Sequence, residues 1–334
     1  MPRPDVEALT KSLEAVVCAR VSGATGVTGL RRLSGGASQE TWSFDATTAG
    51  EPIPLILRRR PRGPAQADAA STALELETEA QLLRLAGDAK VPVPIVRCVL
   101  EPGDDLGSGF VMERLAGETI PQRIFRDETL QGVLPGLARQ CGEILAGIHG
   151  VPRDALPDLP HADARTQLEQ YRGIYDRFDD PHPVFELAFR WIEDHLTDAH
   201  GECLVHGDFR NGNLLIDPGG VRGVLDWELA HLGDPMEDLG WICVNSWRFG
   251  RIDSPVGGFG SREDLAAGYE ANGGKPVDLE RVRFWEVVGT LKWGIMCTMM
   301  LFGFRHGPDR SVERAAIGRR ASETEIDLLE LIAP

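Results

Sequence analysis

The sequence predicts an α+β fold in which a small antiparallel β lobe with one inserted helix precedes a larger, mainly helical lobe. The chain has 334 residues, enough for about two units of roughly 150 residues each. Short runs of strand-forming residues dominate the first third, and helical periodicity dominates the remainder. We therefore expect the two lobes to span residues 1–115 and 116–334.

The first lobe is predicted to begin with a helix over residues 5–17, where apolar side chains recur at helical spacing. A second helix is expected from a cap at Thr72, with Glu75 three residues later, through Leu85 to a stop at Gly87. Strands separated by glycine- and proline-bearing turns are expected at residues 29–33, 41–46, 54–60, 95–100 and 110–115.

The helical region contains one short β island at residues 203–228, rich in Asp, Asn and His. Within it NLLID, the turn PGG and VRGVLDW form a predicted hairpin. Antiparallel pairing about this turn places Asn213 opposite Val224 and Asp226 opposite about Asn211. Both polar side chains then lie at the same open end of the hairpin.

This pair of oxygen donors suits Mg²⁺, which prefers hard oxygen ligands and keeps positions for water and phosphate. Asp208 precedes Asn213 by five residues, at the mouth of the hairpin. There its carboxylate could accept a proton from a hydroxyl. A solvated acidic turn is the alternative interpretation, but it leaves the spacing of the three residues unexplained.

Protein kinases have this arrangement of a catalytic Asp, an Asn five residues later and a second Asp soon afterwards. The segments HGDFRNGN, VLDWE and LGDPMEDLGW resemble the catalytic loop, metal loop and following helix of the aminoglycoside phosphotransferase and choline kinase-like family. The pattern is most similar to the bacterial and mitochondrial branch of that family, some members of which are joined to acyl-CoA dehydrogenase domains. The resemblance implies a protein-kinase-like two-lobed fold that binds ATP and Mg²⁺.

The resemblance also implies roles for individual residues of the island. Asp208 would be the catalytic base, Asn213 and Asp226 would hold Mg²⁺, and His206 would shape the loop backbone. Asp234 and Asp238 stand at a predicted helix start, where capping is favoured over metal binding. They are expected to brace the site.

In the small lobe, LSGGASQETW resembles the loop that covers the phosphates. Gly35 and Gly36 would allow close approach of the backbone, and Ser38 would offer a hydroxyl or amide. In LILRRRP, Arg58 replaces the lysine that the family uses to bind the α and β phosphates. Glu79 would orient Arg58 through an ion pair.

The segment FVMERL, which contains Met112, would supply the hinge that meets adenine. These residues together predict transfer of the γ-phosphoryl group of ATP to a hydroxyl of a small molecule. Two alternatives remain: a nucleotide-binding pseudokinase without turnover, because Arg58 replaces the lysine, and a metal-dependent hydrolase using His206, Asp208, Asp226 and His231. The acceptor stays open among aminoglycosides, hydroxyacyl thioesters, choline-like compounds and other alcohols.

Composition excludes several other classes. The net charge of −16 repels nucleic acid and anionic lipid, so neither is an expected partner. The longest nearly unbroken apolar run, Trp293 to Phe304, is shorter than the about 20 residues that span a bilayer. The six cysteines form no CxxC pair, which gives no support to a zinc site. We expect a cytoplasmic protein that does not contact a membrane.

Overall fold

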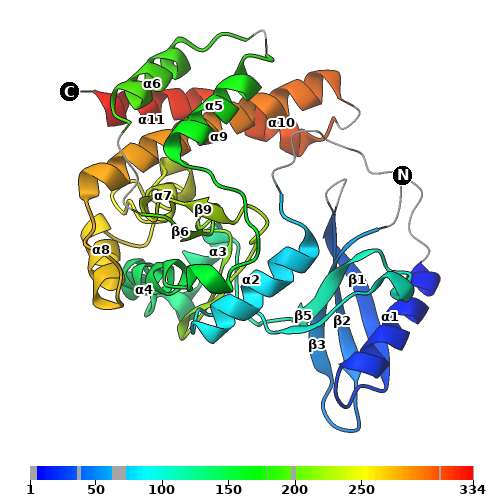
Figure 1. Ribbon diagram of the computed structural model, residues 1–334. Helices are drawn as coiled ribbons and strands as arrows, with labels where there is room; N and C mark the ends of the chain where they lie inside the picture. The colour runs from blue at the N-terminus through cyan, green and yellow to red at the C-terminus, as the bar shows by residue number, and fades with distance from the viewer. Residues whose placement is uncertain are drawn as a thin grey trace.

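The computed structural model describes residues 6–35, 39–61, 73–178, 180–196, 201–307 and 310–333. Within them the chain forms a small lobe around an antiparallel sheet and a larger helical lobe, as the sequence predicts (Figure 1). The strands follow the order β1-β2-β3-β5-β4 across the sheet. Their bounds are β1 Gly26–Gly35, β2 Glu40–Thr47, β3 Ile53–Arg60, β4 Val96–Val99 and β5 Ser108–Glu113.

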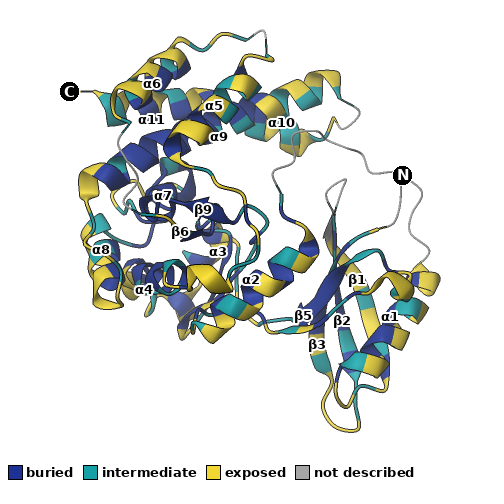
Figure 2. Ribbon diagram, viewed as in Figure 1, coloured by how far each residue is buried: buried dark blue, intermediate teal, exposed yellow. Residues whose placement is uncertain are grey.

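The two faces of this sheet are buried against different helices. Successive residues of a strand point to opposite faces, so Leu55 and Leu57 lie on one side of β3 and Ile56 on the other. The two leucines pack with α1 (Val6–Arg20) in one core cluster. Ile56 packs toward α2 (Leu76–Asp88) in a second cluster that continues into the large lobe. Both faces of β2, β3 and β5 are therefore largely buried, whereas much of β1 is exposed (Figure 2).

The inserted helix α2 starts later than the sequence predicts. Thr72, the expected cap, lies outside the described residues, and the helix begins at Leu76 after Glu75, which is extended and makes no capping bond. The chain reverses just after the helix, where Lys90 has a φ of 67°. The prolines that follow then keep the chain extended up to β4, as expected.

The large lobe is organised around one long helix, α9. In it α9 packs against α5, α6, α7, α10 and α11, while α4 packs against α8 (Figure 1). The helices are α3 Pro121–Ile124, α4 Leu137–His149, α5 Ala164–Tyr175, α6 Pro183–Asp194, α7 Met236–Trp241, α8 Arg262–Ala271, α9 Leu279–His306, α10 Val312–Gly318 and α11 Ala321–Ile332.

By length and apolarity alone, α9 could cross a membrane. Its buried side chains run from Arg281 to Thr298 and form the middle of the large lobe. Such a core helix passes the same test, so this match is weak support for a membrane span. The helix is longer than the apolar run noted in the sequence because it continues through charged residues at both ends.

The β island forms two short antiparallel pairs, β6 (Cys203–Val205) with β9 (His231–Gly233) and β7 (Leu214–Asp217) with β8 (Gly220–Val224). The predicted β7–β8 hairpin is present, but its register at the open end was wrong by one residue. A bulge after the first pairs sets Leu214 opposite Val224, and the N–H of Leu225 donates to Asn213 at 2.9 Å. Asn213 consequently lies beside the residue that precedes Asp226.

Candidate active site

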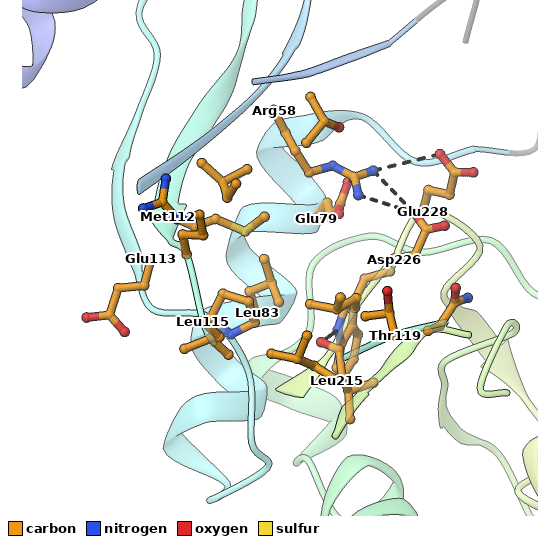
Figure 3. A pocket seen from close by; sticks show the side chains of 18 of the residues that line it. Arg58, Glu79, Leu83, Met112, Glu113, Leu115, Thr119, Leu215, Asp226 and Glu228 are labelled. Atoms are coloured by element: carbon orange, nitrogen blue, oxygen red, sulfur yellow. Dashed lines mark hydrogen bonds and ion pairs between the residues drawn. The ribbon is translucent and has the colours of Figure 1, made fainter. Parts of the chain in front are cut away.

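A cavity of about 610 Å³ lies between the small lobe and the β island. Ile56, Met112 and Leu215 give it apolar walls. Its polar lining comes from both lobes and includes Asn213 together with Arg58, Glu79, Asp226 and Glu228, which Figure 3 labels. The structure thus brings together most of the site residues expected from the sequence.

Asp208 lies next to this lining and contacts it through Asn213. Its Oδ2 accepts a hydrogen bond from Asn213 Nδ2 at 2.6 Å, and its backbone carbonyl accepts from the same amide at 3.0 Å. Its Oδ1 accepts from Trp241 Nε1 at 2.9 Å and from Arg210 Nε at 3.0 Å. Because the Asn213 amide nitrogen is used by Asp208, its oxygen is the atom left for a ligand.

His206 joins the two loops that carry these side chains. Its Nδ1 accepts from the N–H of Asp208 at 3.2 Å, and its Nε2 donates to the carbonyl of Leu225 at 3.2 Å. Burial lowers the pKa of His206, although nearby carboxylates oppose the shift. A neutral ring with one acceptor and one donor nitrogen fits both bonds, so His206 holds backbone in place.

Asp238 holds the backbone of the loop that carries His206 and Asp208. Its carboxylate accepts from the N–H of His206 at 2.8 Å and of Gly207 at 3.0 Å, and it also contacts Nε2 of His149 at 3.0 Å. Burial alone would raise the pKa of Asp238, but these hydrogen bonds and the neighbouring histidines lower it overall. The ionised carboxylate of Asp238 therefore holds the backbone of the loop at His206 and Gly207.

Asp234 and His231 are also occupied by the fold. Asp234 accepts from the N–H of Met236 at the start of α7, and its other oxygen lies 2.9 Å from Arg281. His231 Nε2 lies 3.0 Å from Glu237. These contacts brace the island, as expected for Asp234, and they turn His231 away from the cavity lining.

Arg58 connects the two lobes across the cavity. Its guanidinium lies 3.2 Å from Glu79, 3.2 Å from Asp226 and 3.9 Å from Glu228, and it donates to Gln39 at 3.1 Å. The expected ion pair between Arg58 and Glu79 is present. Figure 3 shows the arginine pointing toward Asp226 and Glu228 with Glu79 beside it.

The charges in this cluster do not balance. Burial, with smaller contributions from Asp226 and Glu228, raises the pKa of Glu79 to about 7 despite the attraction of Arg58. Burial also raises the pKa of Glu228, with Asp226 adding to the shift. Arg58 Nε and Glu79 Oε2 are buried without a hydrogen-bond partner among the described residues. Carboxylate and amide oxygens beside an incompletely bonded guanidinium fit both Mg²⁺ and phosphate.

The predicted phosphate loop is described only in part. Gly35 ends β1, while Gly36 and Ser38 lie outside the described residues. Met112 lies near the end of β5, where it is 8% exposed and lines the cavity.

Three side chains of the site were not assigned from the sequence. Trp241 and Arg210 hold Asp208, and Glu228 faces Arg58. Arg210 lies two residues after Asp208, and Glu228 two after Asp226, so proximity in the sequence was an available signal. Trp241 comes from α7 and could be found only through the fold.

Comparison with known proteins gives the family. The model of the phosphotransferase enzyme family (APH) matches residues 29–285. The chain belongs to this family. The match spans the cavity lining, residues 206–213 and most of the large lobe, and it confirms the resemblance carried by HGDFRNGN and VLDWE.

Sequence relatives include acyl-CoA dehydrogenase family member 10 of Mus musculus, 30% identical over 204 residues. That match covers 57% of this chain and 18% of the mouse protein. The chain spans less than a third of the length of the first curated relatives that it matches.

Solved structures with the same fold include a candidate aminoglycoside phosphotransferase from Ralstonia eutropha, with a TM-score of 0.74 and 22% identity over 96% of this chain and 97% of that chain. A thermostable mutant of aminoglycoside phosphotransferase APH(4)-Ia, in complex with AMP-PNP and hygromycin B, has a TM-score of 0.61 and is 17% identical. That match covers 96% of this chain and 99% of that chain. These structures show that the chain has the kinase-like fold.

Proposed function

We propose that the chain is an ATP-dependent kinase that transfers the γ-phosphoryl group to a hydroxyl of a small molecule, with Asp208 as the base. The main supporting observation is the joint placement of Asp208, Asn213 and Asp226 beside the interlobe cavity. The bound nucleotide analogue in APH(4)-Ia supports nucleotide use by the same fold. We place the lobe boundary after residue 115 and assign the protein to the cytoplasm.

In the proposed reaction the acceptor oxygen forms a bond to the γ-phosphorus, and the bond from that phosphorus to the β–γ bridging oxygen breaks. ADP leaves with the electron pair, and the hydroxyl proton passes to Asp208. A carboxylate offers about four acceptor positions. Trp241, Arg210 and Asn213 occupy three in this structure, which leaves one on Oδ2 for the hydroxyl.

The other assigned residues bind the nucleotide. Asp226 and the amide oxygen of Asn213 would hold Mg²⁺, which supplies neutralisation of phosphate charge when bound. Arg58, oriented by Glu79, would contact the α and β phosphates. The remaining contacts assigned to the nucleotide come from the phosphate loop and the hinge, namely Gly35, Gly36, Ser38 and Met112.

The acceptor is proposed to be an alcohol, and the names of the sequence relatives select the first candidates. Because those relatives are called acyl-CoA dehydrogenases, hydroxyacyl thioesters are the first class to assay. Aminoglycosides and choline-like alcohols form the comparison set. No nucleic acid or membrane partner is proposed.

The decisive experiment measures ADP release from MgATP over this panel of alcohols, followed by the Asp208→Ala variant. We expect that variant to lose at least about 100-fold in kcat, the usual contribution of a positioned base, while still binding ATP. Asp217→Asn, which changes a carboxylate at the far end of the same hairpin, is the matched control. Wild-type turnover by Asp208→Ala would remove Asp208 from the role of base.

A pseudokinase is the second candidate, and one observation favours it: Arg58 stands in place of the lysine and is paired with Asp226. ATP binding by a folded protein that releases no ADP with any acceptor would establish it. The hydrolase alternative has less support, because His206 and His231 are both committed to hydrogen bonds within the fold.

A further inference from the structure

Lys292 is a buried cation in the middle of α9. Lys292 is 6% exposed and lies within the apolar segment TLKWGIM. Lysine is almost never fully buried without a partner, because removing an ammonium group from water is costly. Among the described residues no carboxylate lies within ion-pair distance of its Nζ. Another interaction must therefore account for the burial of this charge.

The ammonium group has two contacts on the catalytic side of the helix. Nζ donates to the carbonyl of Gly207 at 3.2 Å and lies 4.5 Å from the centroid of the Trp241 ring. Burial alone would lower the pKa of Lys292, whereas Tyr171, Glu237 and Asp208 raise it, and the net shift is upward. The group is therefore a charged donor.

The contact with Gly207 fixes the peptide that precedes Asp208. In this peptide the carbonyl of Gly207 accepts from Lys292, while the N–H of Asp208 donates to His206. Gly207 has a φ of +78°, and a Cβ at this position would lie 2.4 Å from the carbonyl oxygen of Leu229. The peptide is held at both ends in a conformation that requires glycine.

The contact with Trp241 fixes the carboxylate itself. Lys292 lies over the Trp241 ring, and the N–H of that ring donates to Oδ1 of Asp208 at 2.9 Å. Two separate paths thus run from one ammonium group to Asp208, one through the main chain and one through the indole.

We propose that Lys292 is a positioning residue for phosphoryl transfer: it fixes the backbone before Asp208 and the indole of Trp241, and so sets the orientation of the Asp208 carboxylate. This inference rests on the proposed function, in which Asp208 takes the proton of the acceptor. Lys292 itself does not touch the nucleotide cavity.

The alternative explanation, that Lys292 serves the stability of the fold, predicts a different outcome. Lys292→Met leaves the carbonyl of Gly207 without its donor, so both explanations predict a lower Tm, and kcat separates them. If Lys292 acts through Asp208, the folded Lys292→Met variant should also lose activity. A purely structural role would lower the Tm and leave the kcat of the folded variant unchanged.

The kinetic test compares Lys292→Met with Lys275→Met, a matched control at an exposed lysine. With the best acceptor of the panel, we expect Lys292→Met to lower kcat by about 10- to 100-fold, as for a misplacement of about 1 Å. KM for ATP should stay within about twofold, because the nucleotide contacts are intact. If Lys292→Met fails to fold, Lys292→Gln, which keeps a donor but no charge, takes its place.

A spectroscopic test separates this inference from the proposed function. The indole N–H resonance of Trp241, identified by its loss in Trp241→Phe, reports the hydrogen bond to Asp208 without any turnover. We expect Lys292→Met to shift this resonance and to speed its hydrogen exchange. A wild-type protein without turnover would overturn the proposed function, and the resonance would then decide the role of Lys292. An unchanged resonance together with kcat within twofold of wild type would overturn the positioning role.

Discussion

Arg58 Nη1 lies 3.2 Å from Oδ1 of Asp226, so β3 of the small lobe is paired directly with the loop that follows β8. The same guanidinium also approaches Glu79 and Glu228. One positive charge therefore serves three carboxylates. A metal ion bound to Asp226 would share this carboxylate with Arg58, so metal binding and the pairing of the lobes are expected to influence each other.

Removing Arg58 should destabilise the protein. Arg58→Met leaves Glu79 buried beside two other carboxylates, and breaking a buried ion pair typically costs about 3–5 kcal/mol. Arg60→Met is the matched control, since the pair between Arg60 and Glu75 is largely exposed and should contribute at most about 1 kcal/mol. Chemical denaturation of the two variants measures the difference. Equal losses would mean that the interlobe pair contributes no more than a surface pair.

Glu79 should make stability depend on pH. Its folded pKa of about 7 lies above the ordinary value of 4.5, so between these values the folded state binds more protons than the unfolded state. The stability that Glu79 contributes is present at low pH and is lost as the pH rises toward and through 7. Relative to Glu79→Gln, the wild type should lose about 3 kcal/mol between pH 4.5 and pH 8. Parallel curves for the two proteins would contradict the raised pKa.

Asp226 should control the dependence on magnesium. We expect ATP and Mg²⁺ together to raise the Tm of the wild type more than the sum of their separate effects. In Asp226→Asn the Mg²⁺ concentration for half-maximal stabilisation should rise by about tenfold or more, because an anionic oxygen donor is lost. Asp217→Asn serves again as the control. An unchanged magnesium titration in Asp226→Asn would remove Asp226 from the metal site.

Gly207→Ala should disrupt the catalytic loop. The added Cβ would meet the carbonyl of Leu229 at 2.4 Å, at a φ that costs non-glycine residues about 1–2 kcal/mol. We expect a lower Tm and a large loss of kcat. Gly173→Ala, at an exposed position of α5 with open space around it, should instead stabilise the protein by about 0.5–1 kcal/mol. Thermal denaturation compares the two glycines directly.

Much of the fold could be predicted from the sequence because local patterns determine it. Runs of strand-forming residues between turns predicted the strands of the small lobe, and helical periodicity predicted the mainly helical large lobe. The register at the open end of the β7–β8 hairpin could not be predicted, because a bulge inserts one residue without a clear signal. The start of α2 also differs from the predicted one: the helix begins at Leu76, and Glu75 before it makes no capping bond.

The site was predictable where spacing along the chain determines proximity. Asp208 and Asn213 share one loop, and the hairpin brings Asp226 close to them. Trp241 and Lys292 were missed because their contacts with the catalytic loop depend on the packing of α7 and α9. The signal in the sequence that was available for Lys292 is a single charged residue inside an otherwise apolar stretch of helix.

The apolar cluster shared by α2, the inner face of the sheet and the large lobe has a consequence for cooperativity. Ile56, Leu83 and Met112 belong to the same cluster as Leu145 of α4, so no apolar boundary separates the two halves of the cavity. Heating should accordingly melt both halves in one calorimetric transition. The cavity between the lobes would then be lost in the same step, and only surface elements would unfold separately.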